Sequence, residues 1–378
     1  HIRERIMSLV KYAGVSLIAM SASMGNAGGM EATALSAGFM FEDGGFGSVS
    51  IQSQSPSVKG TIGGASITSA SLIGSVTSTN IKVKMDVLDN TSVGINYYRQ
   101  AGIKLDYPSN WTAGTAQQIA TMPKVDLDVT ALSLMVKYGF GENFSVLGGI
   151  KNGSASDATV SILASGVSAV AKGENVLSYI AGAAYEMPEI ALRAELIYET
   201  KADYALTTNF AAIPTVHAGD AAGKIHASTP NYLNLYVQSG IAEDTLAYAS
   251  IRQADWKTNQ VSIATTFTGG AKIDLSDFAD TTSYEIGLGR KFGNTWSSSI
   301  AYNWEGGSGP DSTSYFTLTD GRQGISVGAK YSLNANTAIS FGGNYTEFGK
   351  VTHDAPKGGA LFSGNTATTL GLNFSHSF

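Results

Sequence analysis

Six short polar turns divide this sequence into paired segments, and longer connections alternate with those turns. The turns are centred near residues 89, 141, 188, 243, 293 and 335, which places them roughly 40 to 55 residues apart. Between two successive turns lie two segments of alternating apolar and polar residues and one longer polar or glycine-rich stretch. Because a period of two is typical of β-strands, the chain is predicted to consist of antiparallel hairpins.

The last segment shows the alternation most clearly. Leu370, Leu372, Phe374 and Phe378 are separated by small or polar residues. An apolar face of this kind packs inward in a soluble sandwich and faces lipid in a membrane barrel, and the pattern alone does not separate the two. The connections do, because short turns at one end and long loops at the other are typical of a transmembrane barrel.

The strand count follows from the turns. Six turns join twelve strands, and one further strand lies at each end, expected near residues 39–53 and 368–378. The predicted fold is therefore all-β: a 14-stranded antiparallel transmembrane β-barrel with short periplasmic turns, longer external loops and both termini on the periplasmic side. Closure of the barrel pairs every wall strand on both edges, as a lipid environment requires.

The first 27 residues have the pattern of an export signal. Arg5 and Lys11 precede a short apolar stretch, and Gly25 and Ala27 fit a cleavage site after Ala27. The apolar stretch is too short for a membrane helix, which needs about 20 residues. The expected division is a signal peptide over 1–27, a short N-terminal segment over 28–38 and the barrel over 39–378, in the outer membrane of a Gram-negative bacterium.

Composition excludes several classes of function. The net charge is −6 and no basic cluster is available for phosphates, which argues against a nucleic-acid partner. The five histidines are scattered and cysteine is absent, so no pattern of a hydrolase or metal site emerges. Asp126 and Asp128 supply too few carboxylates for calcium. The sequence therefore predicts no enzymatic activity, no metal and no cofactor.

Several stretches resemble the long-chain fatty-acid transporter (FadL/TodX) family of outer-membrane proteins. They lie at 38–45, 140–150, 183–193, 239–246 and 287–292, and their order along the chain carries the similarity. The resemblance covers about residues 38–378. It implies a monomeric barrel that captures fatty acids or aromatic hydrocarbons at external loops, passes them through the lumen and releases them sideways through a gap at the third strand.

One departure from the family concerns the N-terminal plug. The family carries a longer plug with an Asn-Pro-Ala motif, whereas here only residues 28–38 precede the expected first strand and that motif is absent. The plug is therefore expected to be short or missing, and gating by plug movement is an open question. The apolar Met30, Ala34 and Leu35 would allow a short segment to fold into the lumen mouth.

Apolar residues in three expected external loops form a candidate capture site. Hydrophobic cargo first meets polar lipopolysaccharide, so a capture site has to be apolar and to project outward. The alternative is that these residues pack the loops against one another. The candidates are Trp111 in the second loop, Ile162, Leu163 and Val167 in the third, and Phe210 and Ile213 in the fourth.

Charged residues are also expected inside the barrel. Alternation places Lys151, Arg193 and Arg252 in the lumen, together with Glu195 and Glu199. A fatty-acid carboxylate in a dry cavity needs a cation or hydrogen-bond donors, so the three basic residues are candidate cargo ligands. The alternative is that they pair with the carboxylates of the wall and need no ligand.

Two functions remain after these exclusions. The first is a passive channel for hydrophobic small molecules, and the second is a general porin for small polar solutes. Porins commonly carry an arginine-rich constriction, and only five arginines follow residue 27, which favours the first. Expected partners are the hydrophobic ligand, outer-membrane lipids and lipopolysaccharide, and the barrel-assembly machinery, which would read the terminal Phe378.

Overall fold

The protein is described here from a computed structural model. The structure describes residues 29–62, 67–107, 123–162, 167–210, 221–266, 269–309, 311–312, 314, 316–353 and 360–378. No helix among these residues is long and apolar enough to cross a membrane.

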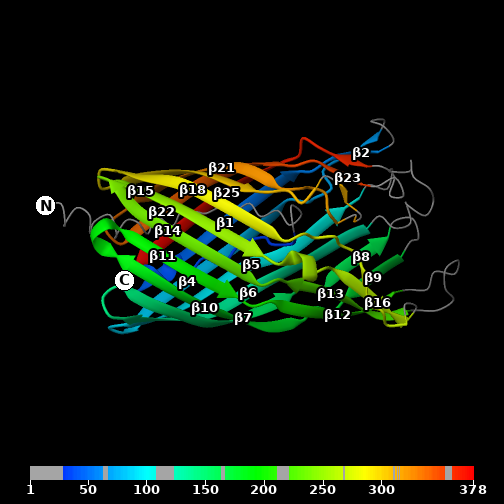
Figure 1. Cartoon of the computed structure of the whole chain (residues 1–378), viewed down its shortest axis with the longest axis horizontal. Coiled ribbons are helices and arrows are strands. Elements are labelled where there is room, and N and C mark those ends of the chain that lie inside the picture. Colours follow the sequence, from blue (N-terminus) through cyan, green and yellow to red (C-terminus); the bar gives the residue numbers. More distant parts are fainter. Residues whose placement is uncertain are drawn as a thin grey trace.

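Within the described residues, fourteen antiparallel strands close into one barrel, as the sequence predicts (Figure 1). Each strand pairs with the neighbours that precede and follow it around the wall, and the pairing of the first and last strands, and of the third with the fourth, closes the ring. The wall strands in chain order are β1 (Phe46–Ser57), β4 (Val76–Leu88), β5 (Thr91–Asp106), β6 (Pro123–Phe140), β7 (Phe144–Ala155), β10 (Asn175–Met187), β11 (Leu192–Glu199), β14 (Tyr232–Ala242), β15 (Thr245–Ala254), β18 (Thr281–Phe292), β19 (Trp296–Glu305), β21 (Arg322–Ser332), β22 (Thr337–Phe348) and β25 (Thr366–Ser377).

All six predicted turns are confirmed at one end of the barrel. They join β4 to β5, β6 to β7, β10 to β11, β14 to β15, β18 to β19 and β21 to β22. Two of them are tight because Gly141 and Gly293 adopt φ angles of 65° and 63°, a region that glycine enters without a steric penalty. The C-terminus lies at the same end (Figure 1).

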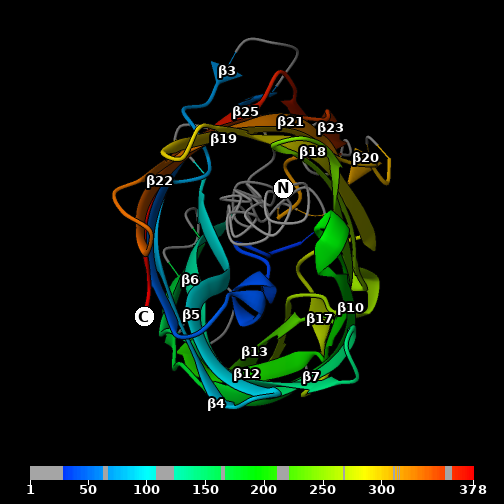
Figure 2. The ribbon, with the colours of Figure 1, turned by 90° about the vertical axis from the view of Figure 1, so that its left-hand side faces the viewer.

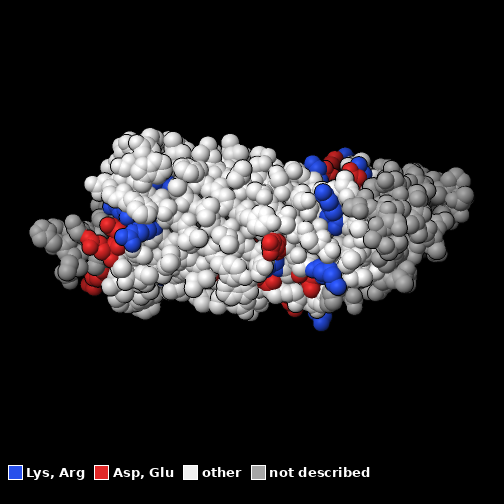
Figure 3. All heavy atoms as spheres, turned by 90° about the horizontal axis from the view of Figure 1, so that it is seen from above, with Lys and Arg blue, Asp and Glu red and all other residues white. Residues whose placement is uncertain are grey.

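The outer face of the wall is apolar, and its polar counterpart faces inward. Ile51, Leu372 and Phe374 are about half exposed, at 53%, 54% and 49%, whereas the alternating Asn373 and Ser375 are buried. In Figure 3, charged side chains gather towards the two ends of the barrel with a largely uncharged band between them. This is the arrangement of a barrel whose outer surface meets lipid.

The opposite end carries additional strands where the sequence analysis expected loops. The long connections themselves are confirmed, and the third and fourth contain hairpins because their alternating apolar residues pack against a common core. The strands form an extension of β6 and two small sheets: β8 (Ala158–Ile162) and β9 (Val167–Ala171); β12 (Ala202–Phe210), β13 (Ala221–Thr229), β16 (Ser262–Thr265) and β17 (Ile273–Asp274); and β20 (Asp311–Ser312), β23 (Val351–His353), β24 (Leu361–Phe362), β2 (Gly60–Ile62) and β3 (Ile67–Thr68).

The first wall strand begins later than predicted. Strand β1 starts at Phe46 instead of residue 39, because Gly38–Phe41 forms the 3-10 turn η1 and turns the chain inside the barrel. Figure 2 shows η1 within the ring of strands. Two further 3-10 turns are η2 (Pro188–Ile190), in the turn between β10 and β11, and η3 (Trp256–Thr258), directly after β15. Residues 29–45 are called the N-terminal segment below.

Candidate functional site

The N-terminal segment is packed inside the barrel. Leu35, Phe39 and Met40 are buried at 4%, 4% and 0% exposure, and they join the inward-facing Met135 and Ile180 in one apolar cluster. The segment thus covers the inner wall on the side of β5 to β11. Of the apolar residues expected to allow such packing, Leu35 lies in this cluster and Met30 is buried in a second apolar cluster.

A bulge in β5 receives this segment. Arg99 lies opposite Thr130 of β6 and Ala101 lies opposite Val129, so Gln100 is an extra residue in the strand. The bulge changes which residues point inward, from Tyr98 before it to Ala101 and Ile103 after it, all three of which are buried. Bulges redirect side chains and interrupt pairing, which makes this position a break in the wall.

The N-terminal segment uses the backbone that the bulge leaves free. The Gln100 carbonyl accepts hydrogen bonds from the N–H groups of Ala32 (2.8 Å) and Thr33 (3.3 Å), and the Gly102 N–H donates to the Met30 carbonyl (2.9 Å). A bridge between Glu31 and Ala101 completes this pairing. The segment therefore occupies the β5 edge that β4 occupies elsewhere.

A gap in the wall between β4 and β5 follows from the same bulge. The described β4–β5 ladder ends at the pair Ile81 and Tyr97, although β4 continues back to Val76 and β5 continues to Asp106. Beyond the gap the chain pairs with β5 again, where the Gly74 N–H donates to the Lys104 carbonyl at 3.2 Å. The opening is therefore bounded on both sides by backbone hydrogen bonds.

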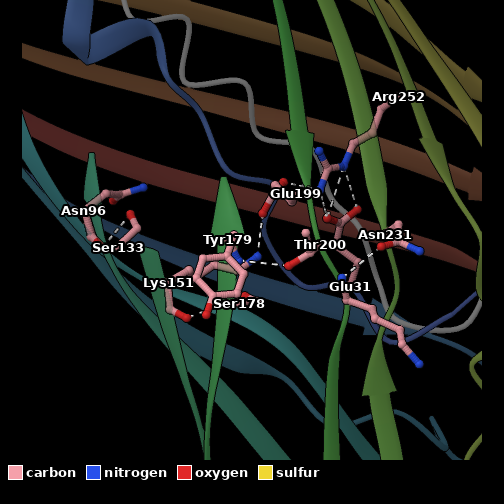
Figure 4. Close-up of polar contacts among 11 residues, drawn as sticks. Glu31, Asn96, Ser133, Lys151, Ser178, Tyr179, Glu199, Thr200, Asn231 and Arg252 are labelled. Carbon is pink, nitrogen blue, oxygen red and sulfur yellow. Dashed lines mark hydrogen bonds and ion pairs between the residues drawn. The ribbon is translucent and has the colours of Figure 1, made fainter. Parts of the chain in front are cut away.

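Two of the predicted lumen cations form one buried network of charges (Figure 4). Lys151 is fully buried and its Nζ donates to Glu199 at 2.6 Å. Arg252 donates to Glu31 through Nε at 3.1 Å and to Glu199 through a terminal nitrogen at 3.2 Å. The network joins β7, β11 and β15 to the N-terminal segment, and its two cations face two carboxylates.

The third predicted cation, Arg193, lies nearer the end with the short turns. Its guanidinium is 3.8 Å from Glu195 and lies over the rings of Phe41 (4.8 Å) and Tyr236 (5.4 Å). All three cations point inward as predicted, and each has a carboxylate of the protein within 4 Å. Pairing with carboxylates of the protein is therefore the second of the two alternatives that the sequence leaves open.

The outer part of the lumen is filled by an apolar core. Trp256 is buried at 2% exposure, and its ring meets Tyr232 and Phe278 edge-on at 6.3 and 5.7 Å. The carboxylate of Asp255, which directly precedes the η3 turn, accepts a hydrogen bond from the Asn231 N–H at 2.8 Å. Gly29 approaches the indole so closely that a Cβ there would lie 2.1 Å from Trp256 Cε2.

A cavity of about 250 Å³ occupies the lumen on the other side of the N-terminal segment. Most of the residues around it are polar, although apolar atoms contribute more of its surface, and they include Thr79 and Asn80 of β4 together with Tyr98 and Arg99 of β5. These residues form the two sides of the wall gap, so the cavity extends to the gap. A second cavity of about 290 Å³ opens at the short-turn end, and Glu42 and Arg193 border both.

The predicted capture site in the external loops lies largely outside the residues that the structure describes. Trp111, Leu163 and Ile213 are not among the described residues. The backbones of Ile162 and Val167 pair at the tip of the β8–β9 hairpin, and Phe210 pairs with Ala221 at the end of β12. An outward apolar patch at these six positions stays a prediction.

Sequence reasoning missed Glu31 and Gln100. The sequence predicts no role for Glu31, yet its carboxylate accepts hydrogen bonds from Arg252. Gln100 carries no signal of its own, because apolar residues stay at odd positions on both sides of it. Only the structure shows that Ile95 and Tyr97 face outward whereas Ile103 and Leu105 face inward.

Comparisons with known proteins agree on the fold. No family model and no curated protein matches the sequence. Among solved structures, a FadL homologue of Pseudomonas aeruginosa is 14% identical with a TM-score of 0.72, covering 95% of this chain and 94% of its own. The Ralstonia pickettii toluene transporter TbuX is 11% identical (TM-score 0.63; 94% and 93% covered), and the Pseudomonas putida toluene transporter TodX is 12% identical (TM-score 0.64; 93% and 96% covered). This chain is therefore similar in its overall fold to those three proteins.

Proposed function

We propose that this protein is an outer-membrane channel of the FadL/TodX family that passes hydrophobic small molecules and releases them sideways between β4 and β5. The wall gap carries this proposal. It lies within the lipid-facing wall, it borders the lumen cavity, and its inner side is covered by the N-terminal segment. An apolar molecule that leaves there enters lipid without crossing water.

The apolar core at the outer end supports the same direction of passage. The buried Trp256, Phe278 and Leu127 belong to one cluster that continues into the external sheets. A hydrophobic molecule that moves through such a core loses little free energy, because each contact with an apolar side chain is replaced by a contact with the next one. A hydrated sugar would have to shed water there without gaining hydrogen bonds.

The general-porin alternative has less support. A porin needs a continuous aqueous path, whereas the described part of this lumen is crossed by the N-terminal segment and filled by apolar side chains at the outer end. The polar residues among those that line the inner cavity are the feature that most favours a porin. The two functions separate in a direct assay.

The assay uses the full-length mature chain reconstituted in liposomes. Uptake of a labelled long-chain fatty acid and of toluene is measured beside swelling in isotonic sugars. We expect uptake of at least one hydrophobic probe and no swelling above that of empty liposomes. Rapid swelling without hydrophobic uptake would overturn the proposal in favour of a porin.

Lateral release has its own test at the bulge. Deleting Gln100 removes the extra residue of β5, which allows β4 and β5 to pair beyond Tyr97. We expect the deletion to abolish uptake while the barrel still folds, as shown by its heat-modifiable migration. Gln100→Ala keeps the extra residue and is the matched control, with uptake retained. Full uptake by the deletion variant would exclude release at this gap.

A further inference from the structure

One arginine of the wall, Arg290, lies on the outer surface of the barrel without a partner. The four other arginines that follow residue 27 have side chains that are 11% to 15% exposed, and each forms an ion pair with a carboxylate of the protein. Arg290 is exposed, and within the described part of the chain it forms no ion pair and no hydrogen bond. Its guanidinium is therefore available to a group outside the protein.

The place of Arg290 in β18 sets the direction of its side chain. The strand pairs with β15 and with β19 without a shift of register. Every second residue of it, at Ile286, Leu288 and Phe292, is exposed on the apolar outer face. Arg290 belongs to the same series, so its side chain leaves the wall towards lipid. A cation on this face is costly at the middle of a bilayer and costs little near its interface.

The neighbours of Arg290 along the strands indicate that it lies near such an interface. Two residues further, Phe292 ends β18 at the end with the short turns and pairs with Trp296. The Trp296 ring lies 4.8 Å from that of Tyr331. Aromatic residues gather in this way where a barrel meets the head groups of a bilayer. The arginine stem can follow the apolar wall while the guanidinium reaches the head-group layer.

Small side chains flank Arg290 on the neighbouring strands. Its register partners are Thr245 of β15 and Ser298 of β19, and Ala329 of β21 follows in the same row. The Thr245 hydroxyl already donates to the Glu243 carbonyl at 3.1 Å. The Ser298 hydroxyl forms no hydrogen bond among the described residues. Since paired residues on adjacent strands have Cβ atoms about 5 Å apart, Arg290 and Ser298 present unused donors side by side.

We propose that Arg290 and Ser298 bind the phosphodiester group of a phospholipid in the leaflet at the short-turn end of the barrel. The guanidinium can donate two parallel hydrogen bonds to two phosphate oxygens, and the Ser298 hydroxyl can donate to one of them. The acyl chains of this lipid lie along the exposed Leu288 and Ile300. The site is separate from the proposed cargo path, because β18 lies on the opposite side of the wall from β4 and β5 (Figure 2).

Lipid titration of the purified full-length barrel tests the proposal. Dioleoylphosphatidylethanolamine, dioleoylphosphatidylglycerol and dioleoylglycerol share their acyl chains, and only the first two carry a phosphodiester. Native mass spectrometry counts the lipids that stay bound to the protein released from detergent. We expect Arg290→Gln to weaken the binding of both phospholipids by roughly fivefold or more, because charge-assisted hydrogen bonds are lost. The binding of dioleoylglycerol should be the same in the two proteins.

Three further variants separate recognition of phosphate from general attraction to charge. Arg290→Lys keeps the charge without the planar fork, so it should retain only part of the affinity. Ser298→Ala should weaken phospholipid binding about two- to fivefold, the effect of one lost hydrogen bond. Lys257→Gln removes an exposed cation near the opposite end of the barrel, and as the matched control it should leave phospholipid binding unchanged. Heat-modifiable migration shows that each variant is folded.

Several results would overturn the proposal. Equal phospholipid binding by the wild-type protein and Arg290→Gln would show that the guanidinium meets only water. An equal loss in Lys257→Gln would show attraction to charge without a defined site, and an equal loss of dioleoylglycerol in Arg290→Gln would show an effect on acyl-chain packing. Displacement of the bound phospholipid by millimolar inorganic phosphate would assign the site to the free anion.

Discussion

Glu31 and Arg252 fasten the N-terminal segment to the wall opposite β5. Arg252 Nε donates to Glu31 Oε1 across 3.1 Å, and the two side chains are only 11% and 14% exposed. The same segment is bound to β5 through the backbone of Gln100. A stretch of a few residues therefore spans the lumen from β5 to β15, directly inside the wall gap.

Removing the arginine of this pair should release the segment. Arg252→Gln leaves Glu31 and Glu199 without their shared cation, and breaking a buried pair in this way costs about 3 to 5 kcal/mol. We expect faster hydrogen exchange at the amides of Ala32 and Gly102, with wall amides such as Leu372 unaffected. Lys201→Gln, which breaks the exposed pair with Asp203, should change stability by less than about 1 kcal/mol. Unchanged protection of Ala32 would contradict a fastening role for Arg252.

The buried pair of Lys151 and Glu199 should act as a structural unit. Lys151→Ala removes the cation that pairs with the buried Glu199 carboxylate, so it should destabilise the barrel by roughly 3 kcal/mol or more. Lys151→Met combined with Glu199→Gln removes both charges and should recover most of that loss. Urea unfolding in bilayers measures both variants. Loss of cargo uptake in the stable double variant would instead point to a direct ligand role for Lys151.

Gly29 should tolerate no side chain. A Cβ at this position would lie 2.1 Å from the indole of Trp256, which is itself enclosed by Tyr232 and Phe278. Gly29→Ala should therefore destabilise the packed outer lumen by about 1 to 3 kcal/mol and change the fluorescence of Trp256. Gly148→Ala is the control, because nothing lies within 4 Å of its added Cβ. Identical emission spectra for the two variants would show that the segment does not press on Trp256.

The external β8–β9 hairpin should loosen in acid. The hydrogen bond from the Gly173 N–H, and then the Lys172 ammonium, lower the pKa of Asp157 below its ordinary value of 3.8. A lowered folded-state pKa contributes stability above pH 3.8, and this contribution is lost as the pH falls from there through the folded-state pKa. We expect protection of the Gly173 amide to decrease over that interval. Asp157→Asn should remove the pH dependence, and an unchanged profile in this variant would exclude Asp157 as its source.

The terminal Phe378 is predicted to serve assembly more than stability. The residue is 63% exposed, while its backbone pairs with Gly45 through two hydrogen bonds of 2.9 Å. Phe378→Ala should therefore leave the stability of the barrel refolded in detergent nearly unchanged. The folded fraction in the outer membrane of cells should fall, because the assembly machinery would lose its recognition residue. Equal losses in cells and in detergent would show that the ring acts through packing.

Much of the fold was accessible from the sequence because it depends on short-range rules. The alternation of Leu370, Leu372 and Phe374 fixes which face of a strand meets lipid, and turn chemistry at Gly141 and Gly293 fixes where strands reverse. The number of strands follows from the number of turns. The inward direction of the lumen cations follows from their places in the alternating pattern of each strand. The first wall strand was misplaced, because Phe39 and Met40 continue an apolar pattern although they fold back into the lumen.

The site depended on relationships that local patterns do not contain. Sequence alternation places Lys151, Arg193 and Arg252 in the lumen, but their partners are chosen by the curvature of the closed barrel, which brings Glu31 to Arg252 across 221 residues. The wall gap arises because one extra residue in β5 ends its pairing with β4 and offers the freed edge to the N-terminal segment. The sequence by itself determined a lipid-facing barrel with a charged lumen, since periodicity is local. Only the tertiary structure decided that those charges are mutually neutralised and that the wall opens beside them, because both depend on which distant backbones meet when the barrel closes.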